Sequence, residues 1–286
     1  MMNSGLSQTK LFDKRYKNIL VKLGVFILWL LVWEAIYQYV GRPILVVSPL
    51  ATFTRISELV VTSRFWLIVR GTTLRVIEGV LLAFSFGCIL AVLTKRIVFL
   101  KVLFEPILGI FRAMPSASII ILALVWLPTF RIPVFIIFLV VTPIIWANIY
   151  EGLGTVDVKL LEMATLFKWS FFKKARYIYL PHLAPFVASA LSTAFGQGFR
   201  TAIGSEVIAR PPNSMGRMIY DARIYMQTIN LFAWTIAVLV VSVLIVKTTT
   251  KLLSLLSNKL AGTTPTASAA EIDVQEGSSD DNQQSQ

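Results

Sequence analysis

The chain is poor in the side chains on which much enzyme chemistry depends. It has one cysteine and one histidine among 286 residues, Cys88 and His182. A single cysteine excludes an internal disulfide, and a single histidine excludes metal sites of the HExxH kind. No P-loop and no glycine-rich dinucleotide fingerprint occurs, so any ATP chemistry has to come from another polypeptide. We therefore expect no metal, no cofactor and no enzymatic activity in this chain itself.

Charged side chains are also scarce. They make up 15% of the sequence, against 56% hydrophobic residues, and the mean hydropathy is +0.73. Soluble domains are usually less than half apolar and about one quarter charged. The composition predicts an integral membrane protein.

Acidic residues are rare before the C-terminal tail, which leaves the rest of the chain strongly basic. The formal net charge is +12 although five acids lie in the last sixteen residues. Most of the basic residues flank apolar runs, where the positive-inside bias accounts for them without a nucleic-acid partner. We expect no nucleic-acid binding.

Apolar runs of the length needed to cross a bilayer recur along the chain. Six spans put every basic cluster on one side, so the expected fold is all-α with six transmembrane helices and both termini in the cytoplasm. The expected spans are 20–40, one ending near residue 94, 102–127, 132–150, 183–208 and 231–246. The third is interrupted at Pro115, which removes a backbone donor and disfavours helix at Met114.

The same pattern gives a domain division. We expect a cytoplasmic segment at 1–19, a six-helix transmembrane domain at 20–258 and a disordered acidic tail at 259–286. Within the membrane domain, 151–180 forms a basic cytoplasmic loop, and 41–66 forms an external loop with a short helix.

The cytoplasmic loop contains the most informative stretch of the chain, EMATLFKWSFFKKARYIYLP at 162–181. Leu160, Met163, Ala164 and Phe167 recur at helical spacing and predict one short amphipathic helix. Asp157 is a suitable N-cap for it, and Ser170 for a second helix. Such a helix can lie on the membrane surface, fit a partner's groove, or be part of a solvated basic loop.

This stretch resembles the cytoplasmic loop of permease subunits of ATP-binding-cassette (ABC) importers. Their pattern is E-A-A, three residues, G, nine residues, I-x-L-P. The chain keeps this spacing in full, from Glu162-Met163-Ala164 through Lys168 to Ile178-Tyr-Leu180-Pro181. It departs from the pattern at two positions, Met163 and Lys168.

Other short motifs resemble the nitrate/sulfonate/bicarbonate (taurine)-type permeases. They are Val47-Ser-Pro49, Thr73-Leu-Arg75 with Gly79, Met114-Pro115, Ser205-Glu206-Val207, Met215-Gly216 and Tyr220-Asp-Ala-Arg223. The resemblance implies a type I importer of the bacterial inner membrane, in which two permease copies line the path and two cytoplasmic ATPase subunits dock on the coupling loops. An extracellular or periplasmic binding protein delivers the solute.

The resemblance also implies roles for particular residues. The ATPase-coupling segment would include Glu162, Met163, Ala164, Lys168, Ile178, Leu180 and Pro181. Glycine at position 168 would allow a left-handed backbone that is costlier for Lys168. The helix is therefore expected either to end differently, near Trp169, or to carry a docking surface adjusted to one ATPase.

Ionisable residues inside the membrane need an explanation, because each costs about 2.5–3.5 kcal/mol at the centre of a helix on insertion scales. Arg75 and Glu78 are expected to pair at i, i+3. In the fifth span, Ser189, Thr193, Gln197, Arg200 and Thr201 are close to one helical face. That face is either polar contact between packed helices or a wet lining of the translocation path, with Gln197, Arg200 and Glu206 as possible path residues and Arg200 as an anion contact.

The leading interpretation is therefore the permease subunit of an ATP-driven importer. The solute is a small oxyanion such as nitrate, bicarbonate or a sulfonate, or an organic nutrient. The alternative is a secondary transporter or channel that works without an ATPase subunit.

Overall fold

The computed structural model of the chain describes residues 5–261, with side chains described from residue 20 to residue 255. That part of the chain contains helices and no strand, which confirms the all-α prediction. The α-helices are α1 (Gly5–Val40), α2 (Pro49–Val61), α3 (Ser63–Arg96), α4 (Val98–Ala113), α5 (Ser116–Trp126), α6 (Ile132–Gly154), α7 (Val158–Leu166), α8 (Phe171–Lys174), α9 (Leu180–Ala209), α10 (Met215–Ile224) and α11 (Thr228–Ala261). One π-helical turn, Ala175–Tyr179, joins α8 to α9.

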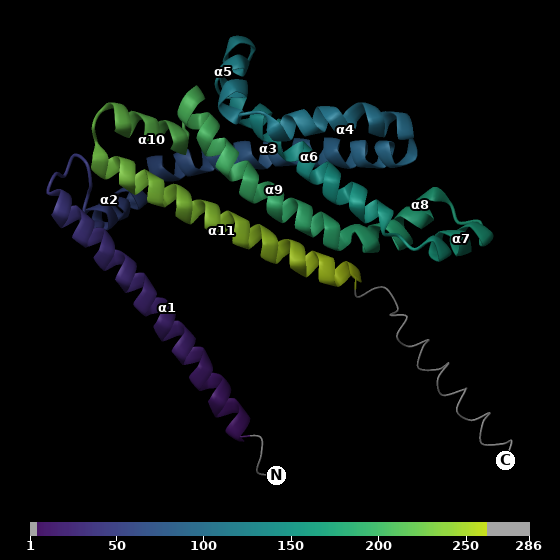
Figure 1. Ribbon diagram of the computed structural model, residues 1–286, viewed down its shortest axis with the longest axis horizontal. Coiled ribbons are helices and arrows are strands. Elements are labelled where there is room, and N and C mark those ends of the chain that lie inside the picture. The colour runs from purple at the N-terminus through teal and green to yellow at the C-terminus, as the bar shows by residue number, and fades with distance from the viewer. Residues whose placement is uncertain (1–4, 262–286) are drawn as a thin grey trace.

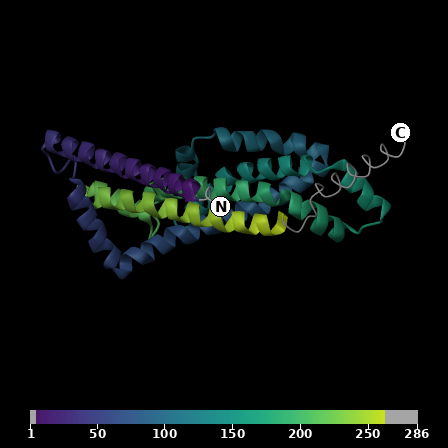
Figure 2. The ribbon, with the colours of Figure 1, turned by 90° about the horizontal axis from the view of Figure 1, so that it is seen from below.

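The long helices run roughly side by side, and α1 diverges from the others toward its N-terminal end (Figure 1). In the view of Figure 2, α2 and the start of α3 meet at a turn that projects from the bundle. Five of the described helices are long and apolar enough to cross a membrane, or six when the bent pair α4 and α5 counts as one span. The predicted tail, 259–286, lies outside the described residues from 262 onward, and the predicted N-terminal segment, 1–19, is described only from residue 5, where α1 begins.

Helix α6 forms the centre of the bundle, between α3 and α9. Small residues allow these helices to approach closely. On α3, Gly79, Ala83, Gly87 and Ala91 recur every four residues and are all buried. A Cβ at Gly79 would lie 2.8 Å from the Ile137 side chain, and one at Gly87 would lie 3.0 Å from that of Ile145. The α3–α6 interface therefore depends on backbone-to-side-chain contact.

The predicted interruption of the third span is confirmed. Helix α4 ends at Ala113, α5 begins at Ser116, and the two axes differ by 103°. Met114 has an extended backbone, as expected for a residue before proline. Arg112 Nη2 donates to the Pro143 carbonyl at 2.8 Å, which joins this bend to α6.

Candidate functional site

The cytoplasmic-loop stretch folds as a helical insert that follows α6 and ends in the first turn of α9, and we define it as residues 155–182. It occupies one end of the molecule, where α7 and α8 extend beyond the long helices (Figure 1). Both predicted caps are present: Asp157 accepts from the Lys159 N–H at 2.8 Å, and Ser170 Oγ accepts from the Lys173 N–H at 3.4 Å. These caps satisfy N–H groups that a short helix leaves free.

Lys168 adopts the left-handed conformation that the related pattern gives to glycine, with φ of 50°. The Lys168 N–H donates to the Thr165 carbonyl at 2.9 Å, and the Trp169 N–H donates to the Ala164 carbonyl at 2.8 Å. This pair of bonds is a Schellman motif, which satisfies the last carbonyls of α7. Of the two alternatives stated for this position, a helix end near Trp169 is wrong, since α7 ends at Leu166 and the turn keeps its left-handed shape with lysine in place. The other alternative, a docking surface adjusted to one ATPase, stays a prediction.

The insert has a small core of its own. Ala164 is 0% exposed and packs with Val156 and Ile178, which are also buried. Ile178 therefore holds the returning π-helical turn against α7. The extra width of that turn coincides with Pro181, which has no N–H to donate to the preceding turn.

The remaining residues of the predicted coupling segment face outward or lie at the junction. Glu162, Met163, Lys168 and Leu180 are exposed, and Pro181 is half-buried. The structure thus separates two buried positions of the segment, Ala164 and Ile178, from neighbours that are available to a partner.

Large apolar side chains cover the outward side of the insert. Leu166, Phe167 and Phe172 are 82%, 71% and 83% exposed. A shallow depression of about 540 Å³ lies beside them, lined by Val158, Leu161, Glu162, Thr165 and Leu166. Exposed apolar residues grouped in this way are typical of an interaction surface.

The two ends of the insert are tied to each other and to the central helices. Thr155 Oγ1 lies 2.9 Å from His182 Nε2, across the junction between the end of α6 and the start of α9. The insert is therefore joined both to the end of α6 and to the start of α9.

On α9, the predicted polar face is exposed in the single chain. Ser189, Thr193 and Arg200 are exposed, and Gln197 and Thr201 are half-buried. Arg200 Nη1 donates to Gln197 Oε1 at 3.5 Å. A hollow of about 330 Å³ lined by Asn148, Glu151, Pro185, Phe186 and Ser189 extends this face toward the insert. Two glycines of α9 differ in their surroundings: a Cβ at Gly198 would lie 3.0 Å from the Val80 side chain, whereas nothing lies within 4 Å of one at Gly204.

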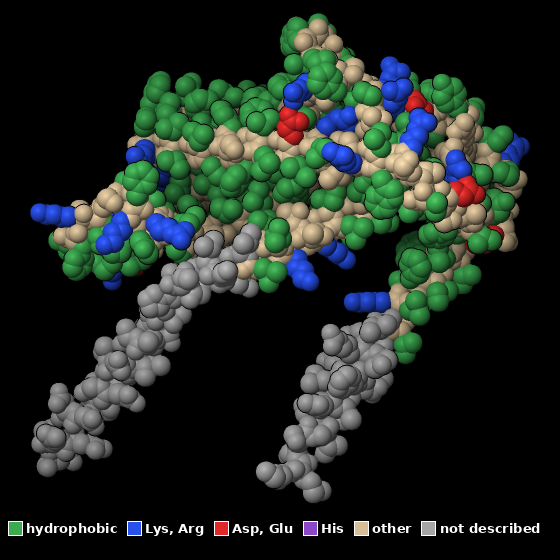
Figure 3. Space-filling view, turned by 180° about the vertical axis from the view of Figure 1, so that it is seen from behind, with side chains coloured by type: hydrophobic (Ala, Val, Ile, Leu, Met, Phe, Trp, Pro, Cys, Tyr) green, Lys and Arg blue, Asp and Glu red, His purple; other side chains and the backbone are tan. Residues whose placement is uncertain are grey.

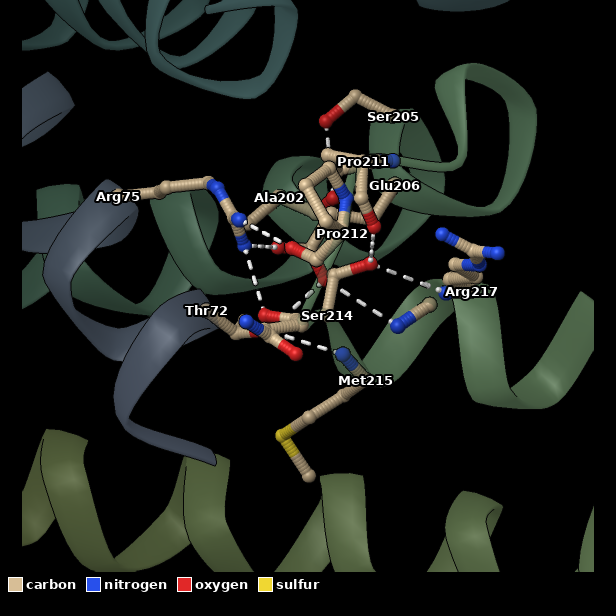
Figure 4. A network of polar contacts seen from close by, with 12 residues as sticks. Thr72, Arg75, Ala202, Ser205, Glu206, Pro211, Pro212, Ser214, Met215 and Arg217 are labelled. Atoms are coloured by element: carbon tan, nitrogen blue, oxygen red, sulfur yellow. Dashed lines mark hydrogen bonds and ion pairs between the residues drawn. The ribbon is translucent and has the colours of Figure 1, made fainter. Parts of the chain in front are cut away.

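Glu206 does not lie on that face. It is 0% exposed and accepts from Thr72 Oγ1 at 2.9 Å, Arg75 Nη1 at 3.0 Å and the Gly216 N–H at 3.2 Å (Figure 4). A buried charge is tolerated only with such partners. The structure makes Glu206 a junction between α3, α9 and α10 and not a wall of an open path.

The expected pairing of Arg75 with Glu78 is wrong. Arg75 turns to Glu206 and to the carbonyls of Pro212 and Asn213, at 2.6 and 3.2 Å, while Glu78 pairs with Arg131. A Cβ at Gly71 would lie 2.2 Å from the Asn213 carbonyl oxygen, which explains the close approach of this loop to α3. Sequence reasoning missed Thr72 and Ser214. The one signal in the sequence for this junction was that Arg75, Glu206 and Gly216 each lie in a short motif that resembles the same permease family.

Fold and surface together define a multi-span membrane protein with a pair of short helices, α7 and α8, projecting at one end. In Figure 3, Lys and Arg gather at the end that carries α7 and α8, and further charged groups lie nearer the opposite end. Hydrophobic side chains cover much of the surface between these two charged regions. This distribution fits a helical transporter component.

Comparison with known proteins identifies the family. Residues 83–260 match the family of binding-protein-dependent transport system inner membrane components. The chain belongs to this family and is a multi-pass inner-membrane permease component of an ABC importer.

One curated relative and two solved structures agree with this assignment. The chain is 23% identical over 232 residues to the putative aliphatic sulfonates transport permease protein SsuC of Bacillus subtilis (strain 168), covering 79% of this chain and 82% of the relative. This relative confirms the resemblance to the sulfonate and nitrate type. A bacterial ABC transporter involved in the import of the acidic polysaccharide alginate has the same fold, with a TM-score of 0.57, 13% identity and coverage of 87% of this chain and 99% of that one. The bacterial alginate transporter in complex with an alginate pentasaccharide-bound periplasmic protein also gives a TM-score of 0.57 at 13% identity, covering 88% and 98%.

Proposed function

We propose that this permease is driven by a separate cytoplasmic ATPase that docks on the helical insert. The observation that carries the proposal is the exposed apolar surface around Leu166 and Phe167 on a helix that is capped, closed by a Schellman turn and packed on its own core. A rigid element of this kind transmits force. Since Thr155 and His182 join its two ends, movement of the ATPase would shift α6 and α9 together.

The polar face of α9 is proposed to line the translocation path between two copies of the chain. Ser189, Thr193 and Arg200 are exposed in one copy, and exposed polar groups at membrane depth require water or a polar partner. A second copy facing the first would enclose this surface. Arg200 then favours an anionic solute, for which a small oxyanion such as a sulfonate, nitrate or bicarbonate is suitable, with an organic nutrient as the alternative.

The proposal includes the remaining parts of such an importer. A solute-binding protein outside the bacterial inner membrane delivers the solute, and ATP is hydrolysed on the partner subunits. Both termini and the insert lie in the cytoplasm, in keeping with the basic residues at that end.

The docking surface can be tested by co-purification with the ATPase of the same importer. Leu166→Asp is expected to abolish recovery of the ATPase, while Ile224→Asp, an equally drastic change on α10 at the opposite end, is expected to leave it intact. Both positions are exposed in the single chain, at 82% and 56%. Full recovery of the ATPase with Leu166→Asp would exclude the insert as the docking site.

A further inference from the structure

A group of basic and aromatic side chains lies beside the insert and has no part in the docking surface. It consists of Lys95 and Arg96 at the end of α3, Lys101 on α4, Tyr150 on α6 and Phe171 on α8. We call it the α3–α4 basic cluster. The α3–α4 turn and the end of α6 bring these residues together.

The three cations contact aromatic rings. Lys95 Nζ lies 4.8 Å and Lys101 Nζ 5.3 Å from the centre of the Tyr150 ring, and Arg96 lies 5.2 Å from that of Phe171. None of the ion pairs found among the described side chains includes them. Glu105, four residues after Lys101, and Glu151, next to Tyr150 in the chain, are thus not their partners within 4 Å. Two ammonium groups on one ring leave positive charge that no described acidic side chain neutralises within 4 Å.

The neighbouring surface is apolar. Val98, Phe99 and Val102, on the first turns of α4, are 73%, 71% and 67% exposed. They begin two residues after Arg96 and lie on a helix of the membrane domain. A molecule that fills this position must carry negative charge at one end and hydrocarbon at the other.

We propose that the α3–α4 basic cluster binds the headgroup of an anionic phospholipid, with its acyl chains along the exposed side of α4. Cations near the membrane surface attract anionic lipids, and aromatic rings at that depth hold the cations in position. Gly154 contributes by its lack of a side chain, because a Cβ there would lie 2.9 Å from Lys95 Nζ. Since Phe171 belongs to α8, a bound lipid also steadies the insert, a consequence that rests on the proposed function, whereas the binding itself does not.

The test is native mass spectrometry of the full-length chain in detergent, titrated with phosphatidylglycerol or phosphatidylcholine. Each cation near an anionic lipid contributes a factor of about five. The double variant Lys95→Gln/Lys101→Gln is therefore expected to bind phosphatidylglycerol about 25-fold more weakly. The matched control, Lys247→Gln/Lys251→Gln, removes the same charge from exposed positions on α11 and is expected to change binding less than twofold.

The ring gives an independent readout. Tyr150→Phe keeps the aromatic face and is expected to retain phosphatidylglycerol binding, while Tyr150→Leu is expected to weaken it severalfold. Equal losses in the two lysine double variants would overturn the proposal, and so would equal binding of phosphatidylcholine by the unaltered chain. Displacement of phosphatidylglycerol by inorganic phosphate at a similar concentration would overturn the lipid assignment. None of these outcomes depends on ATPase docking.

Discussion

Arg75 on α3 and Glu206 on α9 form an ion pair, with Nη1 and Oε1 3.0 Å apart, although 131 residues separate them in sequence. The carboxylate is fully buried and the guanidinium side chain is 14% exposed. The pair connects two of the helices that enclose α6 to the loop that leads into α10. It is therefore a structural junction at the end of the molecule opposite the insert.

Removal of one partner should be costly. Arg75→Ala leaves a buried carboxylate without its charge partner, and we expect a loss of about 3–5 kcal/mol in the free energy of unfolding. Arg131→Ala is the matched control, because its pair with Glu78 is about half exposed on both sides and contributes about 0–1 kcal/mol. Thermal unfolding of both variants in detergent compares them directly. Equal thermal midpoints of the two variants would show that the buried pair contributes no more to stability than the exposed pair.

Lys168 should be strained in its left-handed turn. Lys168→Gly is expected to stabilise the end of α7 by about 1 kcal/mol, because glycine adopts positive φ without a steric penalty. Hydrogen exchange at the Trp169 amide, which donates to Ala164, reports on this turn. Met226 has the same left-handed backbone at a distant helix end, so Met226→Gly serves as a control: it removes a similar strain there and should leave exchange at Trp169 unchanged. Faster exchange at Trp169 in Lys168→Gly would contradict the argument. Normal transport coupling in this variant would show that lysine is tolerated variation, and a loss would indicate an interface matched to one ATPase.

Much of the local structure could be predicted from sequence because its causes are local. Asp157 and Ser170 cap the helices that follow them, and Pro115 breaks the third span where expected. Pairings between elements that are distant in the sequence could not be predicted in this way. Arg75 has Glu78 one helical turn away, yet it pairs with Glu206, because the Pro212 and Asn213 carbonyls lie on the same side and complete its hydrogen bonds. The stripe on α7 was likewise correct in period, but only packing could show that Ala164 faces inward while Met163 faces outward.

That distinction separates two substitutions in the insert. Glu162 is exposed beside the docking depression, so Glu162→Ala is expected to leave the insert folded and to lower solute-stimulated ATP hydrolysis in the reconstituted importer. Ala164→Asp buries a carboxylate in the small core and should loosen the whole insert. Limited proteolysis of the two variants distinguishes the effects. If Ala164→Asp resists protease like the unaltered chain and Glu162→Ala does not, the assigned orientations of α7 are wrong.

The close approach of α3 and α6 gives a test of packing. A methyl group at Gly79 would meet Ile137 at 2.8 Å, so Gly79→Ala is expected to destabilise the bundle by about 1–3 kcal/mol. Gly109→Ala adds the same methyl group on α4, where nothing lies within 4 Å, and should be neutral or stabilising by up to about 1 kcal/mol. Denaturation in detergent compares the two variants. A Gly79→Ala midpoint as high as that of Gly109→Ala would mean that the helices can separate at no cost.

Arg200 is the residue whose loss should affect the solute and not the fold. Its side chain is exposed and lies on the polar face of α9. Among the described residues its only hydrogen bond is the long one to Gln197, at 3.5 Å. Arg200→Gln keeps a polar side chain but removes the charge, so uptake of an oxyanion by proteoliposomes should fall about tenfold or more, because a charged hydrogen bond contributes about 1.5–3 kcal/mol. Arg200→Lys keeps the charge and should retain part of the uptake. Arg210→Gln, an exposed arginine beyond the end of α9, is the control and should transport normally. Undiminished uptake with Arg200→Gln would remove the anion contact from the proposed path. An equal fall with Arg210→Gln would point to the general surface charge, because only a specific contact distinguishes two exposed arginines that lie ten residues apart in the chain.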